Sequence, residues 1–300
     1  MDKRRTDAAA LKLRIIGLVG LVALLLLQAC STLTLGYNRA ATLGYWWLDS
    51  QLDLNETQSL QVRNELDALH RWHRDILLPE HAGLLQKLRQ QLPAPMSAEQ
   101  ACRAYADLRT QIDQLLARAE PSLVWLASDL SEAQIRSLQK KQADSNADWK
   151  KEWLDPPPDK LREHRYQLLL SRTEDFYGTL QEPQKAALRG YIAQSSFDPQ
   201  RTYVERQRRQ QDLVQVLRKI AAERGNTEQA RTLLRGYLAR LNTSPDAAYQ
   251  RYATTLVDEG CAGFALVHSA MTPAQRLQAV ASIGAYEQDF IALAAQRVTP

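Results

Sequence analysis

The chain has 300 residues, of which 45% are hydrophobic and 24% are charged, so it is long enough for one large globular domain or two smaller ones. Its net charge is +4 at pH 7, but most of this excess precedes residue 30, and residues 30–300 carry a net charge of only +1. A segment so close to neutral lacks the basic surface that nucleic-acid binding requires, and we expect no nucleic-acid partner.

The first 30 residues have the parts of a secretory signal. Basic side chains precede an apolar run over 15–27, and about 13 apolar residues are too few for a transmembrane helix, which needs roughly 20. The run ends in Leu27-Gln28-Ala29-Cys30, which resembles the lipobox of bacterial lipoproteins. The resemblance implies cleavage after residue 29 and acylation of Cys30. Ser31 in the next position implies the outer membrane, on its periplasmic face, in preference to the inner membrane. The alternative is a plain cleaved signal with an unmodified Cys30.

The composition predicts an all-α fold. Leu, Ala, Gln, Arg and Glu are abundant, Ile, Val, Thr and Phe are sparse, and no segment alternates apolar and polar residues with period two. We therefore expect a multi-helix bundle. The chain divides into a signal peptide (1–29), a lipidated aromatic segment (30–50) and two helical halves (51–155 and 156–300), because Pro156-Pro157-Pro158 is the strongest helix break.

The aromatic segment has no long polar tether. It contains Tyr37, Tyr45, Trp46 and Trp47 within twenty residues of Cys30. We expect these rings to pack into the domain and hold it close to the membrane. The alternative is an aromatic belt at the level of the lipid headgroups.

Helix signals recur from Asn55 onwards. Asn55 with Gln58 forms a capping-box pattern before an apolar stripe that runs from Val62 to Ile76, and Pro79 ends or kinks this helix. Further helices are expected over 80–92, from Ser97, from Ser131, and over 159–180, 182–194, 200–224, 227–242, 246–269 and 273–297. The helix from Ser97 is interrupted at Pro121, and its core-facing stripe is expected to be Cys102, Tyr105, Leu108, Ile112, Leu115 and Ala119. Ser244 is the expected N-cap of the helix over 246–269.

A short pattern recurs at irregular spacing: an apolar residue followed four positions later by glutamine. The copies are 54–58, 96–100, 130–134, 180–184 and 271–275. The pattern resembles the Leu-Thr-x-x-Gln motif of small helical periplasmic chaperones of the Spy and CpxP kind. The structural alternative explains it as helix starts, in which the glutamine is the third helical residue of a capping box.

Two cysteines remain beyond Cys30. Cys102 and Cys261 lie among apolar residues of expected helices. In the oxidising periplasm an even pair is a disulfide candidate, and two buried thiols are the alternative.

The densest group of unusual side chains is His70-Arg71-Trp72-His73-Arg74. His70 and His73 share a helix face, but a metal site needs further ligands that the sequence does not supply, so we expect no metal and interpret His73 as a core histidine. Catalytic templates such as Gly-x-Ser-x-Gly and His-Glu-x-x-His are missing, and we expect no enzyme activity and no cofactor apart from the covalent lipid. The run 205–211 is interpreted as a solvated helix face, with an anionic partner as the alternative.

The lipobox, Tyr37-Asn38, Trp47 with Asp49, Gln58 and Trp72-His73-Arg74 before Pro79 together resemble a family of uncharacterised Gram-negative lipoproteins, catalogued as domain of unknown function 6279. The resemblance implies an all-helical periplasmic lipoprotein and supplies no activity. We expect a non-catalytic interaction or scaffold module that binds envelope proteins. A periplasmic chaperone-like protein is the second interpretation, and a cell-wall-active enzyme is the third.

Overall fold

The computed structural model describes residues 32–296. The described residues fall into two compact units, residues 32–40 and 41–296. The first unit contains α2 (Thr32–Asn38), and α3 (Ala40–Leu52) begins at its boundary. Cys30 and Ser31, on which the lipoprotein interpretation depends, lie outside the described residues.

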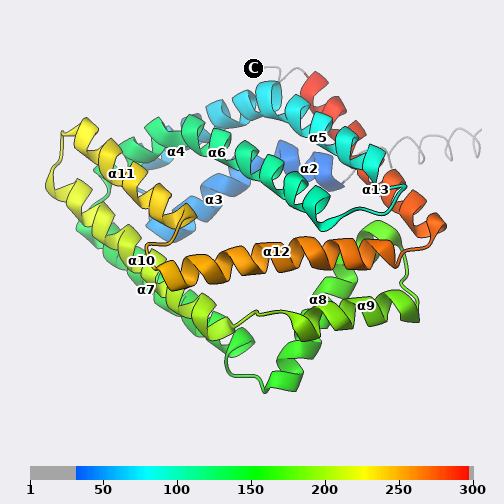
Figure 1. The fold of residues 1–300 in the computed structure, drawn as a ribbon. Helices are drawn as coiled ribbons and strands as arrows, with labels where there is room; N and C mark the ends of the chain where they lie inside the picture. Colours follow the sequence, from blue (N-terminus) through cyan, green and yellow to red (C-terminus); the bar gives the residue numbers. More distant parts are fainter. Residues whose placement is uncertain (1–31, 297–300) are drawn as a thin grey trace, which may run out of the picture. The chain divides into compact units, whose positions relative to one another are not determined.

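The second unit is an all-α, multi-helix bundle, as the composition predicts, and residues 41–296 contain no strand. Figure 1 shows α12 between α6 and α9, and α7 alongside α10. In addition, α5 packs along α13, while α6 contacts α4, α10, α11 and α12. After α3 the helices are α4 (Glu56–Trp72), the π-helix η1 (His73–Leu77), α5 (Leu78–Gln91), α6 (Ala98–Asp129), α7 (Glu132–Trp153), α8 (Pro158–Tyr177), α9 (Glu182–Gln194), α10 (Pro199–Ala222), α11 (Thr227–Asn242), α12 (Ala247–Ser269) and α13 (Pro273–Ala295).

The five recurring segments all begin helices with capping boxes, so the structural interpretation of the pattern is confirmed. The N-caps of α4, α6, α7, α9 and α13 are Asn55, Ser97, Ser131, Gln181 and Thr272, and in each case a glutamine three residues later returns the hydrogen bond. The expectation for α12 was wrong: Asp246, not Ser244, caps it by accepting from the backbone N–H of Ala248. The Ser244 hydroxyl instead donates to Glu205.

Four of these glutamines also join helix starts in pairs. Gln58 Nε2 donates to the carbonyl of Asp129 (3.1 Å), and Gln134 Nε2 donates to the carbonyl of Asp53 (3.2 Å). Each acceptor lies two residues before the N-cap of the partner helix, so the starts of α4 and α7 hold each other. We call this reciprocal arrangement a glutamine clasp.

A second glutamine clasp joins α9 to α13. Gln184 Nε2 donates to the carbonyl of Ala270 (2.9 Å), and Gln275 Nε2 donates to the carbonyl of Thr179 (3.2 Å). These acceptors again lie two residues before the partner's N-cap. The fifth glutamine, Gln100, has only its own capping box among the hydrogen bonds of the described residues.

Two prolines are accommodated without ending a helix. Pro79 follows η1, in which the N–H of Leu78 bonds to the carbonyl of His73, five residues back. The wider π-turn lets the helical path continue through a residue that has no N–H to donate. Pro121 lies inside α6, which runs unbroken over 32 residues, so the expected interruption there is wrong. The contacts that α6 makes with its neighbouring helices outweigh the single lost hydrogen bond.

The hydrophobic core consists of two clusters, and neither follows the halves 51–155 and 156–300. The first is built on α3, α4, α6, α7, α10 and α11, and the second on α5, α8, α9, α12 and α13, with Leu92 and Met96. Each cluster therefore takes helices from both sides of Pro156. Pairings such as α5 with α13 and α7 with α10 cross that position, because the triple proline turns the chain without separating the packing.

The aromatic residues of α3 divide between two faces. Tyr45 is buried and belongs to the first cluster, where Arg63 lies over its ring at 3.4 Å. Trp46 and Trp47 have exposed fractions of 58% and 63%. The expectation that these rings pack into the domain is thus right for Tyr45 and wrong for the two tryptophans, which share the opposite helix face with Leu43.

Candidate functional site

The residues that carry the family resemblance near the N-terminus have local structural roles where the structure describes their bonds. Tyr37 and Asn38 lie on α2, and Trp47 lies on the exposed face of α3. Asp49 accepts a hydrogen bond from the backbone N–H of Leu54 (3.1 Å) and so shapes the turn between α3 and α4. Gln58 is fully buried in the first glutamine clasp.

Arg74 is a buried structural residue. Its guanidinium donates to the carbonyl of Leu293 (3.0 Å) and to Oε1 of Gln296 (3.2 Å), at the end of α13. A planar guanidinium with several donors suits this position, because the last carbonyls of a helix have no partner within the helix. Arg74 therefore ties η1 to the C-terminal helix. Its neighbour Trp72 has the guanidinium of Arg118 at 6.0 Å from its ring centroid.

His73 lies in η1 with its ring centroid 5.2 Å from that of His81 on α5. Burial, together with charge repulsion from the nearby His81 and His70, lowers the pKa of His73 to about 4. The pKa of His81 is also lowered by burial. Neutral, half-buried histidines agree with the interpretation of His73 as a core residue.

No metal-binding group of three His, Cys, Asp or Glu side chains is found among residues 32–296. His70 and His73 share a helix face, as their spacing predicts, and His81 approaches His73 from the next helix. The described part of the chain adds no carboxylate or thiol ligand to them.

The run 205–211 is not a solvated face. Glu205 has an exposed fraction of 4% and accepts hydrogen bonds from Arg208 (2.8 Å), Arg209 (2.8 Å) and Ser244 (3.1 Å). Burial alone would raise the pKa of Glu205, but these hydrogen bonds outweigh it and hold the pKa below its ordinary value. The sequence interpretation was wrong because part of the surroundings of Glu205 comes from distant residues, such as Ser244, which lies 39 positions away in the sequence.

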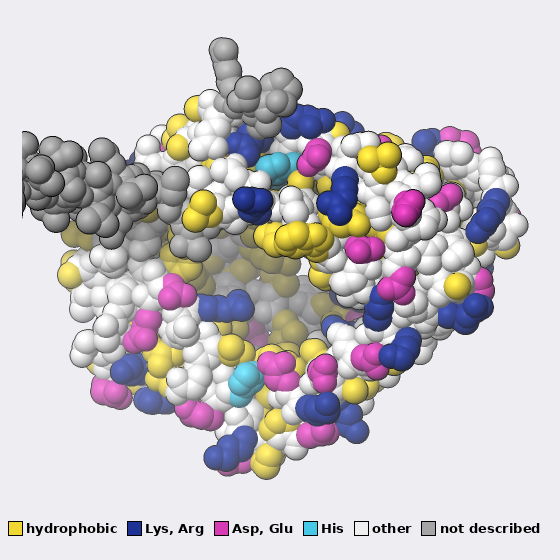
Figure 2. All heavy atoms as spheres, turned by 180° about the vertical axis from the view of Figure 1, so that it is seen from behind, with side chains coloured by type: hydrophobic (Ala, Val, Ile, Leu, Met, Phe, Trp, Pro, Cys, Tyr) yellow, Lys and Arg dark blue, Asp and Glu magenta, His cyan; other side chains and the backbone are white. Residues whose placement is uncertain are grey.

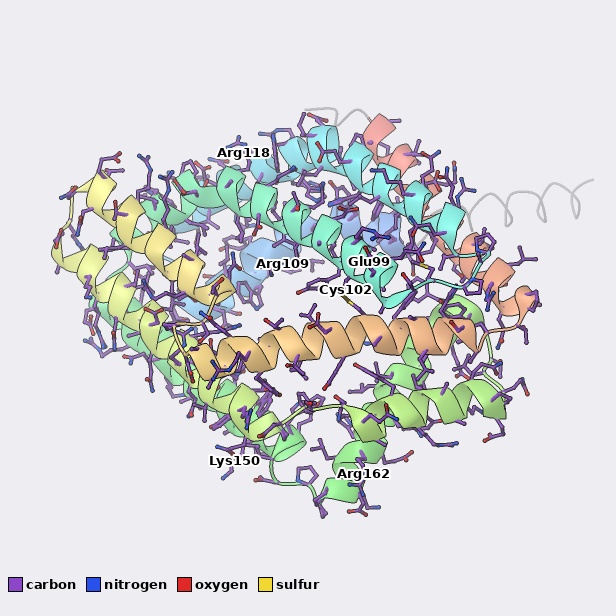
Figure 3. All side chains as sticks on the ribbon, in the orientation of Figure 1. Glu99, Cys102, Arg109, Arg118, Lys150 and Arg162 are labelled. Carbon is purple, nitrogen blue, oxygen red and sulfur yellow. A yellow bond between two sulfur atoms is a disulfide. The ribbon has the colours of Figure 1, made fainter. Side chains whose placement is uncertain are left out.

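A disulfide joins Cys102 on α6 to Cys261 on α12, with 5.3 Å between the Cα atoms. Figure 3 shows Cys102 directed at α12, with Glu99 and Arg109 on the same helix. Arg109 reaches across to Asn242, whose Oδ1 lies 3.0 Å from its Nη2. The disulfide fixes the separation between the N-terminal part of α6 and the middle of α12.

A groove borders this disulfide, and we call it the central groove. It consists of two cavities of about 410 and 550 Å³ that share Leu88, Ala104 and Leu108. Figure 2 shows hydrophobic side chains around a hollow on the face turned away in Figure 1. The first cavity has several polar lining residues: His81, Lys87, Gln91, Gln100, Arg103 and Asp107. The second cavity is mainly apolar, and its lining residues are Leu88, Met96, Ala101, Ala104, Tyr105, Leu108, Leu256, Val257, Gly260, Cys261 and Phe264.

The stripe of α6 that the sequence assigns to the core is largely exposed; Tyr105 and Leu108 line the central groove, and Ile112 lies beyond its lining on the same helix face. Tyr105, Leu108 and Ile112 have exposed fractions of 44%, 51% and 40%. The expectation was wrong because α6 buries apolar residues in the first cluster only near its C-terminal end, around Val124. Sequence reasoning also missed Leu256 and Phe264 of α12, whose only signal was the apolar character of that helix.

Across residues 32–296, no helix has both the length and the apolar composition needed to cross a bilayer.

The model of a family of unknown function, DUF6279, matches residues 50–238, which is more than half of the chain. The matched range includes Gln58, Arg74 and Cys102 and ends before Cys261. No curated protein and no solved structure matches the chain significantly. The chain therefore belongs to DUF6279, a family of unknown function.

Proposed function

We propose that this protein is a non-catalytic interaction module of the bacterial envelope, anchored to the outer membrane by lipid on Cys30 and facing the periplasm. Its central groove binds an apolar helical segment of another envelope protein. One observation carries the proposal: Tyr105, Leu108 and Ile112 lie on one face of α6 and are exposed. This spacing matches the anchors by which apolar helices and grooves recognise each other.

The disulfide supports a binding role for this groove. Because Cys102 and Cys261 hold its two walls together, the groove keeps its width without a ligand. A preformed site loses less conformational entropy on binding than a flexible one. The groove is thus suited to recognising a partner segment of defined shape.

The ionisable groups support a non-catalytic role. Glu120, Glu205 and Asp212 have lowered pKa values because arginines bond to them, and these bonds join neighbouring helices. None of these three carboxylates lines the central groove, where a general acid or base would be expected. His81 does line the groove, but its pKa is lowered by burial, which keeps the ring neutral.

The partner-binding proposal is tested in cells with a photo-crosslinking amino acid in the full-length chain. Position 108 places the crosslinker in the groove, and position 277 on α13 is the matched control, because Leu277 is exposed at 62% and lies outside it. We expect one dominant envelope protein to crosslink from position 108 alone, and Tyr105→Ser with Leu108→Ser, both in the groove lining, to abolish its co-purification. A broad spread of unfolded envelope proteins would instead favour a chaperone-like module.

The anchor is tested separately with Cys30→Ala. Several acyl chains on one residue give stable anchoring, because each buried methylene contributes about 0.8 kcal/mol. We expect the variant to leave the outer-membrane fraction. Retention of the variant in that fraction would contradict lipid anchoring without bearing on the central groove.

A further inference from the structure

Apart from the central groove, a cavity of about 550 Å³ lies among α3, α6, α7, α10 and α11. We call it the leucine groove. Its volume is within the range of small-molecule sites in proteins, roughly 300–1,000 Å³. It is lined by Trp47, Leu48, Gln51, Leu52, Leu123, Leu126, Ala127, Leu130, Leu138, Lys141, Gln142, Ser145, Arg206, Gln210, Leu213, Leu217, Leu234, Tyr237 and Leu238. It shares no lining residue with the central groove, and nearly all of it lies in the range that matches the family.

The leucine groove has an apolar end and a polar end. Helices α7 and α10 run antiparallel, since Arg206 bonds to Ser145 (2.7 Å) while Arg218 bonds to Glu132 (3.0 Å). Leu138 of α7 and Leu217 of α10 therefore lie towards one end, and Ser145 and Arg206 lie at the other. The eleven helical steps from position 206 to position 217 span about 16 Å, a length comparable with an extended fatty acyl chain.

The polar end carries an uncompensated positive charge. Lys141 and Arg206 are the charged residues of the lining, which includes no carboxylate. Lys141 is paired with Asp53 at 2.6 Å. Arg206 takes part in no ion pair within the described part of the chain; it donates to the neutral oxygens of Asn146 (2.7 Å) and Ser145 (2.7 Å). These bonds use two of its five N–H donors, so the guanidinium retains both charge and donors for an anion.

Amide side chains extend this polar end. A smaller cavity of about 150 Å³ shares Gln142 and Gln210 with the leucine groove. It is lined by Gln139, Gln142, Ala143, Asn146, Gln207, Gln210, Gln211 and Val214. Amide groups hydrogen-bond to a polar headgroup without adding charge. They therefore suit a ligand whose polar headgroup extends beyond the anionic group bound at Arg206.

We propose that the leucine groove binds a single-chain anionic amphiphile, with its acyl chain along the leucines and its carboxylate or phosphate at Arg206. An acyl chain brings no polar group into the apolar end. A peptide would place backbone N–H and C=O groups against leucines that offer no hydrogen bonds, which is unfavourable. The charge at Arg206 selects an anionic head over a neutral one. This proposal is independent of the partner binding proposed above.

The test uses membranes that contain the full-length protein and a palmitate analogue with a photoreactive diazirine in its chain. After illumination, labelled peptides are identified by mass spectrometry, which separates groove labelling from acylation at Cys30. Unlabelled palmitate, a lysophosphatidylglycerol and hexadecanol are the competitors. The variants are Arg206→Gln and, as a matched control on the same helix, Arg218→Gln, because Arg218 lies outside the leucine groove.

We expect saturable labelling of peptides that contain residues 123–130 or 213–217. Arg206→Gln should raise the half-saturating concentration about tenfold, as expected for the loss of a hydrogen bond to a charged group, and Arg218→Gln should leave it unchanged. Competition by palmitate assigns a free fatty acid, and competition by the lysophospholipid alone assigns a lipid headgroup. Three results would each overturn the proposal: labelling that does not saturate, competition by hexadecanol as strong as that by palmitate, or labelling that is unchanged in the Arg206→Gln variant.

Discussion

Gln58 and Gln134 lie 76 residues apart and bond to each other, with Gln134 Nε2 at 2.7 Å from Gln58 Oε1. Each also completes its own capping box and donates to the chain ahead of the other's helix. The same glutamine side chain thus caps its own helix and hydrogen-bonds to a segment far away in the sequence. This double use explains why glutamine recurs at these positions, where glutamate would also complete a capping box but has no N–H to donate.

We predict that Gln58→Ala lowers the free energy of unfolding by about 3 kcal/mol, because it leaves the part-buried backbone N–H of Asn55 and the buried Nε2 of Gln134 without their bonds to Gln58. The control is Gln100→Ala, which removes an exposed capping box alone and should cost about 1 kcal/mol or less. Urea denaturation measures both. Equal losses would mean that the glutamine clasp adds nothing beyond capping.

We predict that reduction of the Cys102–Cys261 disulfide lowers the free energy of unfolding by about 5 kcal/mol in the chain-entropy model, because the bond closes a loop of 159 residues. Denaturation with and without a reductant measures the difference, and the double variant Cys102→Ser/Cys261→Ser should be insensitive to the reductant. Mass spectrometry of unreduced tryptic fragments should recover the two cysteine peptides linked. Recovery of unlinked peptides would refute the disulfide.

We predict opposite effects for two glycines of α12. A Cβ at Gly260 meets nothing within 4 Å, so Gly260→Ala should stabilise the protein by about 0.5–1 kcal/mol through helix propensity. A Cβ at Gly263 would lie 2.5 Å from Cε2 of Tyr191, so Gly263→Ala should destabilise it by about 1–3 kcal/mol. Thermal unfolding compares the two variants. A stabilised Gly263→Ala would show that Tyr191 moves aside without cost.

We predict that stability falls as the pH drops from 6.5 to about 4. Burial and the neighbouring histidines lower the pKa of His73 to about 4 in the folded state, below its ordinary value of 6.5. The unfolded chain therefore binds more protons in this range, and protonation favours unfolding. His81 and His268, whose pKa values are also lowered by burial, act in the same direction.

The test of this pH dependence is the urea midpoint between pH 7.5 and 4.5. His73→Gln should flatten the curve. Carboxylates with lowered pKa values, such as Glu205, lose their contribution only at lower pH. A curve that His73→Gln leaves unaltered would assign the pH dependence to other groups.

The helices were predictable from the sequence because their signals are local. Capping boxes at Asn55, Ser131 and Thr272 involve residues only three positions apart, and the structure contains each of them. The long-range hydrogen bonds of the same glutamines were not predictable. Nothing in the sequence near Gln58 indicates that its partner is Gln134.

The faces of the helices were less predictable, for two physical reasons. The π-turn over His73–Leu77 shifts the helical register, so that Leu77 and Leu78 are buried while Ile76, which the stripe placed in the core, is exposed. On α6 the stripe exists, but Leu108 is left 51% exposed among the described residues. An apolar periodicity indicates which residues share a face, and only the tertiary partner decides whether that face is buried.

Helix α6 has a consequence for how the second unit unfolds. Its C-terminal end contributes Val124 to the first cluster, while Cys102 near its other end is bonded to α12, which contributes Val267 to the second. Loss of either cluster removes a support from this one continuous helix. We therefore expect residues 41–296 to unfold in a single cooperative transition, with coincident near- and far-ultraviolet circular dichroism curves.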